Sequence, residues 1–306
     1  MKIFVPKINE SWIVDRAREE WHKNNKDIST KLRNKSDVIW IMAPWLLKSN
    51  RLNLLEKRKV LCTYHHIDLD DFKIDEFKEI DKYVNEYHVI SNKTEQTLRT
   101  LTDKKITAIP LWVNENNWFY ITEKENLRKK FNLKSTDFLI GSFQRDTEGR
   151  DLKSPKLIKG PDIFVQIVKE MSLNNANLKV LLTGKRRQYV INELERHGIP
   201  YAYFKMANIK DLNELYNILD LYVVSSRLEG GPQAISECAI TKTPIISTNV
   251  GLAPEILSKE SIYSFEPLNF SEAKPNIEVA YKNVKKLKIS NLMISYRNMF
   301  EKLYEN

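Results

Sequence analysis

The chain has 306 residues and a net charge of +9, with 42% hydrophobic and 29% charged residues, which is ordinary for a globular protein and long enough for two domains. It contains no run of about 18–20 apolar residues and no basic-then-apolar leader at its N-terminus, so membrane channels are excluded and no signal peptide is expected. Two cysteines, Cys62 and Cys238, imply no disulfide framework and fit a reducing cytoplasm.

The first half alternates short β-rich runs with helix-like segments. Five strands are predicted, over residues 2–6, 37–43, 59–65 and 86–90 and from residue 105 to Pro110, which ends the last of them. Helices are predicted over 11–24, where apolar side chains recur every fourth residue, and over 92–101, which Ser91 or Asn92 can cap.

The second half repeats this alternation. Strands are predicted over 137–143, 178–184, 199–204, 221–226 and 244–249, and helices over 161–171, 188–198, 211–220 and 231–240. A last amphipathic helix is predicted over 291–306. Such alternation predicts parallel sheets covered by helices on both faces, hence two doubly wound α/β domains with a linker near residues 112–135.

Glycine is distributed unevenly, since all eight glycines lie at position 141 or later. Neither a Gly-x-Gly-x-x-Gly motif nor a P-loop is present, which excludes the usual dinucleotide fingerprint and the P-loop NTPases. The sequence also offers no convincing metal cluster. His65 and His66 are adjacent, which suits opposite faces of a strand better than two ligands of one ion.

The most informative stretch is LYVVSSRLEGGPQAISECAITKTPIIST, residues 221–248. A strand leads into a turn with Glu229, Gly230 and Gly231, and Pro232 suits the first position of the next helix. Glu237 lies about one turn into that helix. A helix N-terminus reached through glycines is suited to bind an anion, and carboxylates beside it can accept hydrogen bonds from sugar hydroxyls.

On these residues the chain resembles glycosyltransferase family 4, whose retaining enzymes have the GT-B fold. The family's Glu-x7-Glu pattern is matched by Ser226, Glu229, Gly230, Glu237, Ala239, Pro244 and Ile245, with departures at Cys238 and Thr243. Further matches over residues 137–257 are GSFQRD with Gly141 and Arg145, LIKGPDIF with Lys159 and Gly160, LLTGK with Gly184, and NVGLAPEIL.

The resemblance implies two Rossmann-like domains facing each other across a cleft. Residues 1–120 would form the acceptor-side domain, residues 121–288 the donor-binding domain, and residues 289–306 a helix returning to the first domain.

The resemblance also implies roles for single residues. Arg145 and Lys159 would bind the donor diphosphate and stabilise charge on the leaving group, although Arg150, Lys153 or Lys156 could take the place of Arg145. Glu229 would contact hydroxyls of the transferred sugar and Glu237 those of the ribose. Further donor contacts are expected from Gly231, Gln233, Ala234, Gly184, Lys185 and Met206. Neither a cofactor nor a metal is expected.

The first half matches the family less closely. His65 and His66 follow a strand where the family often places a histidine near the donor sugar, and a structural histidine at a strand end is the alternative. The family's glycine-rich loop after the first strand is missing. Trp21 and Trp40 are expected in the core, whereas Trp12 and Trp45 follow strand ends and are candidates to stack on acceptor sugars.

The sequence therefore predicts a retaining, metal-independent glycosyltransferase that moves a sugar from a nucleotide diphosphate sugar to a glycan, lipid-linked or other acceptor hydroxyl. It is expected in the cytoplasm, with peripheral membrane contact compatible. Two alternatives stay open: a nucleotide-sugar-binding protein without transfer activity, and a basic nucleic-acid-binding protein suggested by the charge. The even spread of that charge and the lack of a nucleic-acid motif count against the latter.

Overall fold

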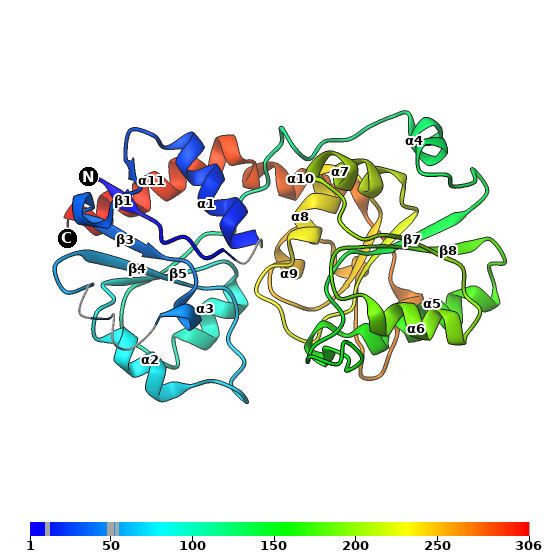
Figure 1. The fold of residues 1–306 in the computed structure, drawn as a ribbon, viewed down its shortest axis with the longest axis horizontal. Helices are drawn as coiled ribbons and strands as arrows, with labels where there is room; N and C mark the ends of the chain where they lie inside the picture. The colour runs from blue at the N-terminus through cyan, green and yellow to red at the C-terminus, as the bar shows by residue number, and fades with distance from the viewer. Residues whose placement is uncertain (10–12, 48–51, 53–54, 306) are drawn as a thin grey trace. The chain divides into compact units, whose positions relative to one another are not determined.

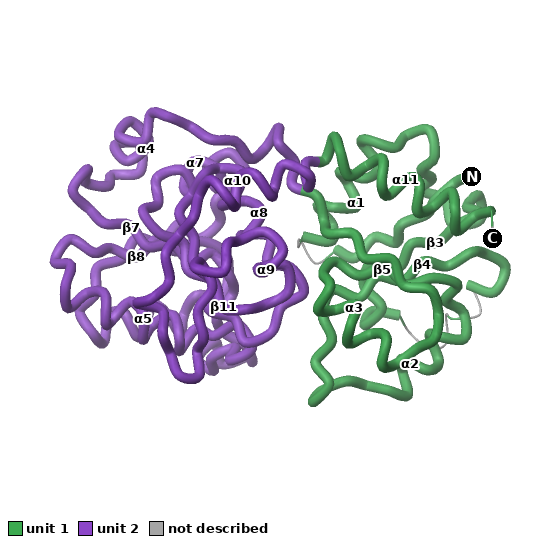
Figure 2. The backbone as a smooth tube through the Cα atoms, turned by 180° about the vertical axis from the view of Figure 1, so that it is seen from behind, with its two compact units in different colours: residues 1–112, 289–306 green, residues 113–288 purple. Residues whose placement is uncertain are grey.

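A computed structural model describes residues 1–9, 13–47, 52 and 55–305. It divides into two compact units (Figure 2). Unit 1 comprises residues 1–112 and 289–306, and unit 2 comprises residues 113–288. Each contains a parallel sheet of six strands with helices on both faces (Figure 1), as the strand–helix alternation predicts.

The sheet of unit 1 has the strand order β2-β1-β3-β4-β5-β6. Its strands are β1 (Ile3–Phe4), β2 (Ser29–Thr30), β3 (Val38–Ile41), β4 (Lys59–Tyr64), β5 (Glu86–Val89) and β6 (Ile106–Ala108). One face is covered by α1 (Ile13–Asn24) and α11 (Ile289–Glu305), the other by α2 (Ile74–Asp81) and α3 (Asn92–Leu98) (Figure 1).

An aromatic cluster fixes α11, the last helix of the chain, to unit 1. Trp21 of α1 and Trp40 of β3 are fully buried, with ring centroids 5.4 Å apart. The ring of Phe300 in α11 lies 5.2 Å from both, and Tyr296 lies 5.5 Å from Trp40. Large buried aromatic side chains contribute several kcal/mol each through burial and packing, so α11 is an integral layer of unit 1.

The sheet of unit 2 has the order β12-β11-β10-β7-β8-β9. Its strands are β7 (Phe138–Ser142), β8 (Leu178–Thr183), β9 (Tyr201–Phe204), β10 (Leu221–Val224), β11 (Ile245–Thr248) and β12 (Ile262–Tyr263). Its helices are α4 (Lys124–Lys130), α5 (Pro161–Leu173), α6 (Gln188–Arg196), α7 (Ile209–Ile218), α8 (Gln233–Ile240), α9 (Ala253–Ile256) and α10 (Ile277–Val284).

Side chains of β7 point alternately to the two faces of the sheet, so the core of unit 2 has a layer on each face. Ile140 packs in a cluster with Val168 of α5 and Leu194 of α6, and α7 and α8 lie over the opposite face of the sheet (Figure 1).

Several predicted elements need correction. The last strand of the first half, expected to end at Pro110, ends two residues earlier at Ala108, since Pro110 cannot donate to a ladder. Pro232 caps α8 instead of opening it. The elements β2, β12, α2, α4, α9 and α10 were not predicted. Most are short, and a two-residue strand such as β2 contains no apolar alternation that could reveal it.

Candidate functional site

The candidate donor site lies at the carboxyl ends of β7 and β10 in unit 2. From β7 the chain continues to β8 and β9 on one side, and then returns to β10 on the other. In open α/β sheets, ligands bind outside the strand ends at such a reversal. Gly160, just before α5, has φ +60°, and a Cβ there would lie 1.8 Å from the carbonyl oxygen of Ser225. Only glycine permits this close approach of the two loops.

A closed ring of polar contacts joins these loops. The Lys159 ammonium forms an ion pair with the Glu229 carboxylate. The Ser226 hydroxyl lies 3.3 Å from the same Glu229 oxygen and 3.2 Å from the Gln144 amide oxygen. Gln144 in turn donates to the backbone oxygen of Lys159 at 2.7 Å. The structure thus brings together two predicted residues, Lys159 and Glu229, and adds Gln144 and Ser226, which were not predicted.

The turn that contains Glu229 is held from both sides. The Arg227 amide donates to the Ile158 oxygen at 2.9 Å, and the Arg227 guanidinium pairs with Asp162 of α5 at 2.6 Å. On the other side, a Cβ on Gly251 would lie 2.1 Å from the Gly230 oxygen. The position of Glu229 is therefore set by backbone packing as well as by its ion pair.

Further cations gather around Lys159. Burial, followed by the charges of Arg145 and Lys159, lowers the pKa of Lys156. Burial and the nearby Arg186 lower the pKa of Arg145, whose Nε donates to the Thr147 oxygen at 2.8 Å. Glu148 and Glu229 offset this repulsion only in part, and a cluster of cations favours a bound anion. Arg186 was not predicted. Arg145 and its alternatives Arg150 and Lys153 are all exposed and Lys156 is half-buried, so burial does not choose among them.

The start of α8 carries the other predicted donor contacts. Gly231 precedes the Pro232 cap, and Gln233 and Ala234 are the first two helical residues. Glu237 lies on the buried side of α8 and accepts a hydrogen bond of 2.9 Å from the Tyr216 hydroxyl. Glu229 and Glu237 thus occupy different environments, one beside a cation and one beside a phenol, and the ribose-binding role of Glu237 stays a prediction.

Three predicted residues follow other strands of the sheet. Gly184 directly follows β8, has φ +90° and accepts a hydrogen bond of 2.8 Å from the Tyr203 hydroxyl. Lys185 beside it is exposed. Met206 follows β9 and is also exposed, at 62%. All three lie at the carboxyl side of the sheet, and their contact with a nucleotide stays a prediction.

A buried ion pair, which was not predicted from the sequence, holds the loop after β7 that carries Arg145 and Lys156. Arg187 and Asp146 are 1% and 2% exposed, with Nε and Oδ2 2.8 Å apart. Arg187 also donates to the backbone oxygen of Ser142 at 2.6 Å. Ser142 ends β7 and Arg187 follows β8. The Arg187 side chain therefore links the ends of both strands to Asp146, the neighbour of Arg145 in the sequence. The only available signal was an Asp and an Arg, each just after a predicted strand.

In unit 1, the two predicted histidines have different surroundings. His65 is buried and donates through Nε2 to the Met42 oxygen at 2.9 Å, whereas His66 is exposed. Burial lowers the pKa of His65 to about 4, so its ring is neutral near pH 7. The exposed Trp45 ring meets His65 edge-on, with centroids 5.9 Å apart. Trp12 lies outside the described residues.

A third histidine, His88, is fully buried next to Trp40. Its Nε2–H donates to the Ile109 oxygen at 2.8 Å, and its Nδ1 lies 2.9 Å from the Thr63 hydroxyl. That hydroxyl accepts the Trp40 indole N–H at 2.8 Å and can therefore donate its own proton to His88. Burial lowers the pKa of His88 to about 3, so this network holds a neutral imidazole.

These two histidines make the stability of unit 1 depend on pH. In the folded chain both histidine pKa values lie below the ordinary value of 6.5. Between about pH 6.5 and about pH 4, the unfolded chain therefore binds more protons than the folded chain. Stability must then fall as pH falls. We expect a loss of about 4 kcal/mol between about pH 7 and pH 5, about half from each histidine, measured by urea unfolding. In His88→Gln the pH slope should be about half as steep. A wild-type stability that does not change over this range would contradict the burial of both rings.

Within the described ranges, no group of three or more His, Cys, Asp and Glu side chains is arranged to hold a metal ion. Among the same residues, no helix combines the length and the apolar character needed to cross a bilayer.

Two doubly wound α/β units, with cations and carboxylates at the strand reversal of the second, define a GT-B fold with the features of a glycosyltransferase. The sequence model of the family "Glycosyl transferases group 1" matches residues 123–294, more than half of the chain. The chain therefore belongs to the group 1 glycosyltransferases.

Solved structures share the fold across both units. HepE of Anabaena, crystallised with UDP and glucose, is similar with a TM-score of 0.75 and 11% identity, covering 98% of this chain and 99% of that one. A glycosyltransferase from Rickettsia africae gives 0.74 and 15%, covering 99% and 98%. Sucrose-phosphate synthase from Thermosynechococcus elongatus gives 0.71 and 14%, covering 95% and 77%. No curated protein matches the chain.

Proposed function

We propose that this protein is a retaining, metal-independent glycosyltransferase of family 4 that uses a nucleotide diphosphate sugar as donor. The observation that carries the proposal is the Lys159–Glu229 ion pair at the strand reversal of unit 2, flanked by Arg145 and Lys156. Cations at this place suit a diphosphate, and a carboxylate beside them suits sugar hydroxyls.

In the proposed reaction, the bond between the anomeric carbon and the donor phosphate oxygen breaks, and a bond to the acceptor oxygen forms on the same face of the sugar. The acceptor proton passes to the departing phosphate oxygen. Lys159 and Arg145 stabilise the negative charge that develops on the nucleotide diphosphate. Glu229 orients the sugar through its hydroxyls while its carboxylate keeps the contact with Lys159.

The nucleotide is proposed to lie against the start of α8. The amide groups of Gly231, Gln233 and Ala234 are the proposed donors to the diphosphate, and Glu237 is the proposed acceptor for the ribose. Gly184, Lys185 and Met206 are proposed contacts of the nucleotide at the neighbouring strand ends. HepE was crystallised with UDP and with UDP-glucose, which supports UDP sugars as the first donors to test.

We assign acceptor binding to unit 1, where the exposed Trp45 follows the carboxyl end of β3. His65 or His66, which follow β4, is the proposed catalytic histidine near the donor sugar. An exposed indole offers a flat apolar face that suits a sugar ring. Cys62 and Cys238 are buried free thiols, which supports the proposed cytoplasmic location. Peripheral membrane contact would follow if the acceptor is lipid-linked.

The test is a binding and turnover screen with UDP, GDP, ADP and TDP and their sugars. One nucleotide should raise the melting temperature by mass action, and its sugar should be transferred or slowly hydrolysed with an unchanged anomeric configuration, measured by NMR. Activity should persist in a chelator. Binding without any turnover would favour a nucleotide-sugar-binding protein, and inversion or loss of activity in the chelator would reject the proposed mechanism.

A further inference from the structure

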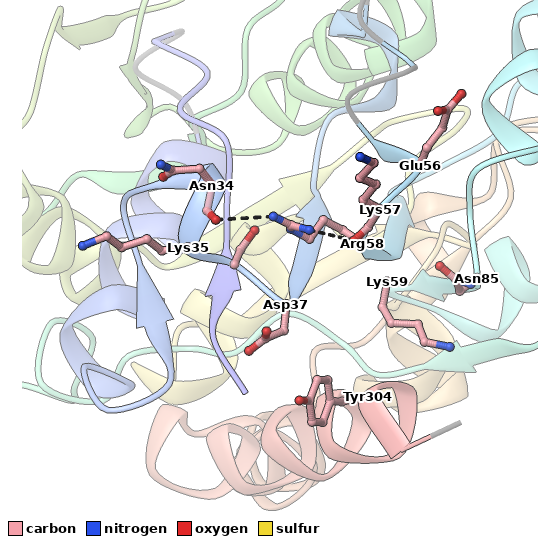
Figure 3. A pocket seen from close by; sticks show the side chains of 10 residues that line it. Asn34, Lys35, Asp37, Glu56, Lys57, Arg58, Lys59, Asn85 and Tyr304 are labelled. Carbon is pink, nitrogen blue, oxygen red and sulfur yellow. Dashed lines mark hydrogen bonds between the residues drawn. The ribbon is translucent and has the colours of Figure 1, made fainter.

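A second polar site lies in unit 1, at the amino ends of its strands. A hollow of about 790 Å³ opens there (Figure 3). Its lining comes from the turns before β3, β4 and β5 and from the end of α11, and comprises Asn34, Lys35, Ser36, Asp37, Glu56, Lys57, Arg58, Lys59, Asn85 and Tyr304. Because β3 and β4 end near Trp45 and His65, the hollow lies at the opposite edge of the sheet from these residues.

The charge of the lining is positive. Four side chains are basic and two are acidic. One of the acidic groups, Asp37, is already engaged, since it accepts the Lys2 amide at 2.7 Å and lies 3.8 Å from the terminal amine. Within the described residues, the ammonium groups of Lys35, Lys57 and Lys59 form no ion pair, although other surface lysines of the unit do, such as Lys82 with Glu79.

The hollow is also held in shape. The Arg58 guanidinium donates to the Asn34 oxygen at 3.3 Å and to the Lys57 oxygen at 2.8 Å, which ties the two turns together (Figure 3). Asn85 accepts the Val60 amide on its side-chain oxygen at 2.8 Å. Its amide nitrogen is thereby oriented as a donor that bonds no group among the described residues. The lining therefore presents one oriented donor, the Asn85 amide, beside three ammonium groups without an ion pair among the described residues.

We propose that this hollow binds a phosphate-bearing ligand. Several ammonium groups spread over a volume larger than one phosphate suit a phosphorylated molecule, with the half-exposed ring of Tyr304 as an apolar wall. Like charges gathered at one place weaken the folded state, and a bound anion would offset that repulsion. The ligand is either a soluble phosphorylated compound or the head group of an anionic lipid, because both present the same oxygens.

The test titrates inorganic pyrophosphate into the full chain carrying Lys159→Ala, so that binding at the proposed donor site is weakened. Adding Lys57→Gln and Lys59→Gln should reduce the remaining affinity at least fivefold, since each removes one charge from the hollow. Lys23→Gln and Lys78→Gln remove two exposed charges elsewhere in unit 1 and should change it less than twofold. Equal effects of the two pairs, or no remaining binding in the Lys159→Ala protein, would overturn the proposal.

Vesicle sedimentation distinguishes a soluble phosphorylated ligand from the head group of an anionic lipid. Binding to vesicles with phosphatidylglycerol but not to pure phosphatidylcholine, lost with Lys57→Gln and Lys59→Gln, would assign a lipid head group. Pyrophosphate binding without vesicle binding would assign a soluble ligand. Failure of the donor screen would leave these outcomes unchanged, because no residue of the hollow belongs to the proposed donor site.

Discussion

Lys159→Ala is expected to lower kcat/KM for the donor sugar by about a hundred- to a thousandfold, the cost of removing one well-placed donor to a developing oxyanion. The ammonium of Lys159 is fixed by Glu229, and the backbone oxygen of Lys159 by Gln144. Such a cation is oriented before the donor binds, so little reorganisation is needed when charge develops. Steady-state kinetics with the donor identified by the nucleotide screen measures the effect.

The matched control is Lys169→Ala, which removes an exposed ammonium on α5 of the same unit. It should leave kcat/KM within twofold of wild type. If Lys159→Ala keeps wild-type turnover, or if both variants lose the same activity, Lys159 does not act on the donor. Because the side chain of Lys159 is partly exposed, the variant should fold, which a circular dichroism spectrum checks.

The sequence was enough to predict that Lys159 and Glu229 belong to one candidate site, because each residue stands at a fixed place in a motif. Lys159 precedes Gly160, and Glu229 precedes two glycines after a predicted strand. Their contact then follows from the topology, since both loops leave the carboxyl edge of one parallel sheet. The fold class was predictable for the same reason, because strand–helix alternation leaves few arrangements.

The supporting groups could not be predicted in the same way. Gln144 and Ser226 contact each other across 82 positions of sequence, and nothing distinguishes either from many surface polar residues. The adjacent His65 and His66 also look equivalent in sequence. Only packing separates them, since His65 is covered in the core and His66 is not. The hollow in unit 1 combines four separate segments, none of which carries a motif.

Arg187→Ala is expected to lower the free energy of unfolding by about 3–5 kcal/mol, because it leaves the buried Asp146 carboxylate without its cation. The loss of the hydrogen bond to Ser142 also loosens the ends of β7 and β8. Denaturant unfolding, followed by the circular dichroism of the full chain, measures the change.

The pH dependence of this loss identifies its cause. Burial already raises the pKa of Asp146, opposed by Arg187, and removal of the guanidinium should raise it further. A carboxyl with a raised pKa holds its proton longer in the folded chain, so its contribution to stability falls as pH rises. The difference in the free energy of unfolding between wild type and Arg187→Ala should therefore be larger at about pH 7 than at about pH 5. Both proteins contain the same histidines, so taking this difference cancels the histidine contribution.

The double variant Asp146→Asn with Arg187→Met tests the same assignment without a buried charge. It should recover part of the stability, since a neutral pair of similar volume avoids the unpaired carboxylate. A loss below about 1 kcal/mol in Arg187→Ala, equal at both pH values, would mean that Asp146 is solvated in the folded protein. The segment that carries Arg145 and Lys156 would then be held by its backbone contacts alone, and the cations of the donor site would not depend on this ion pair.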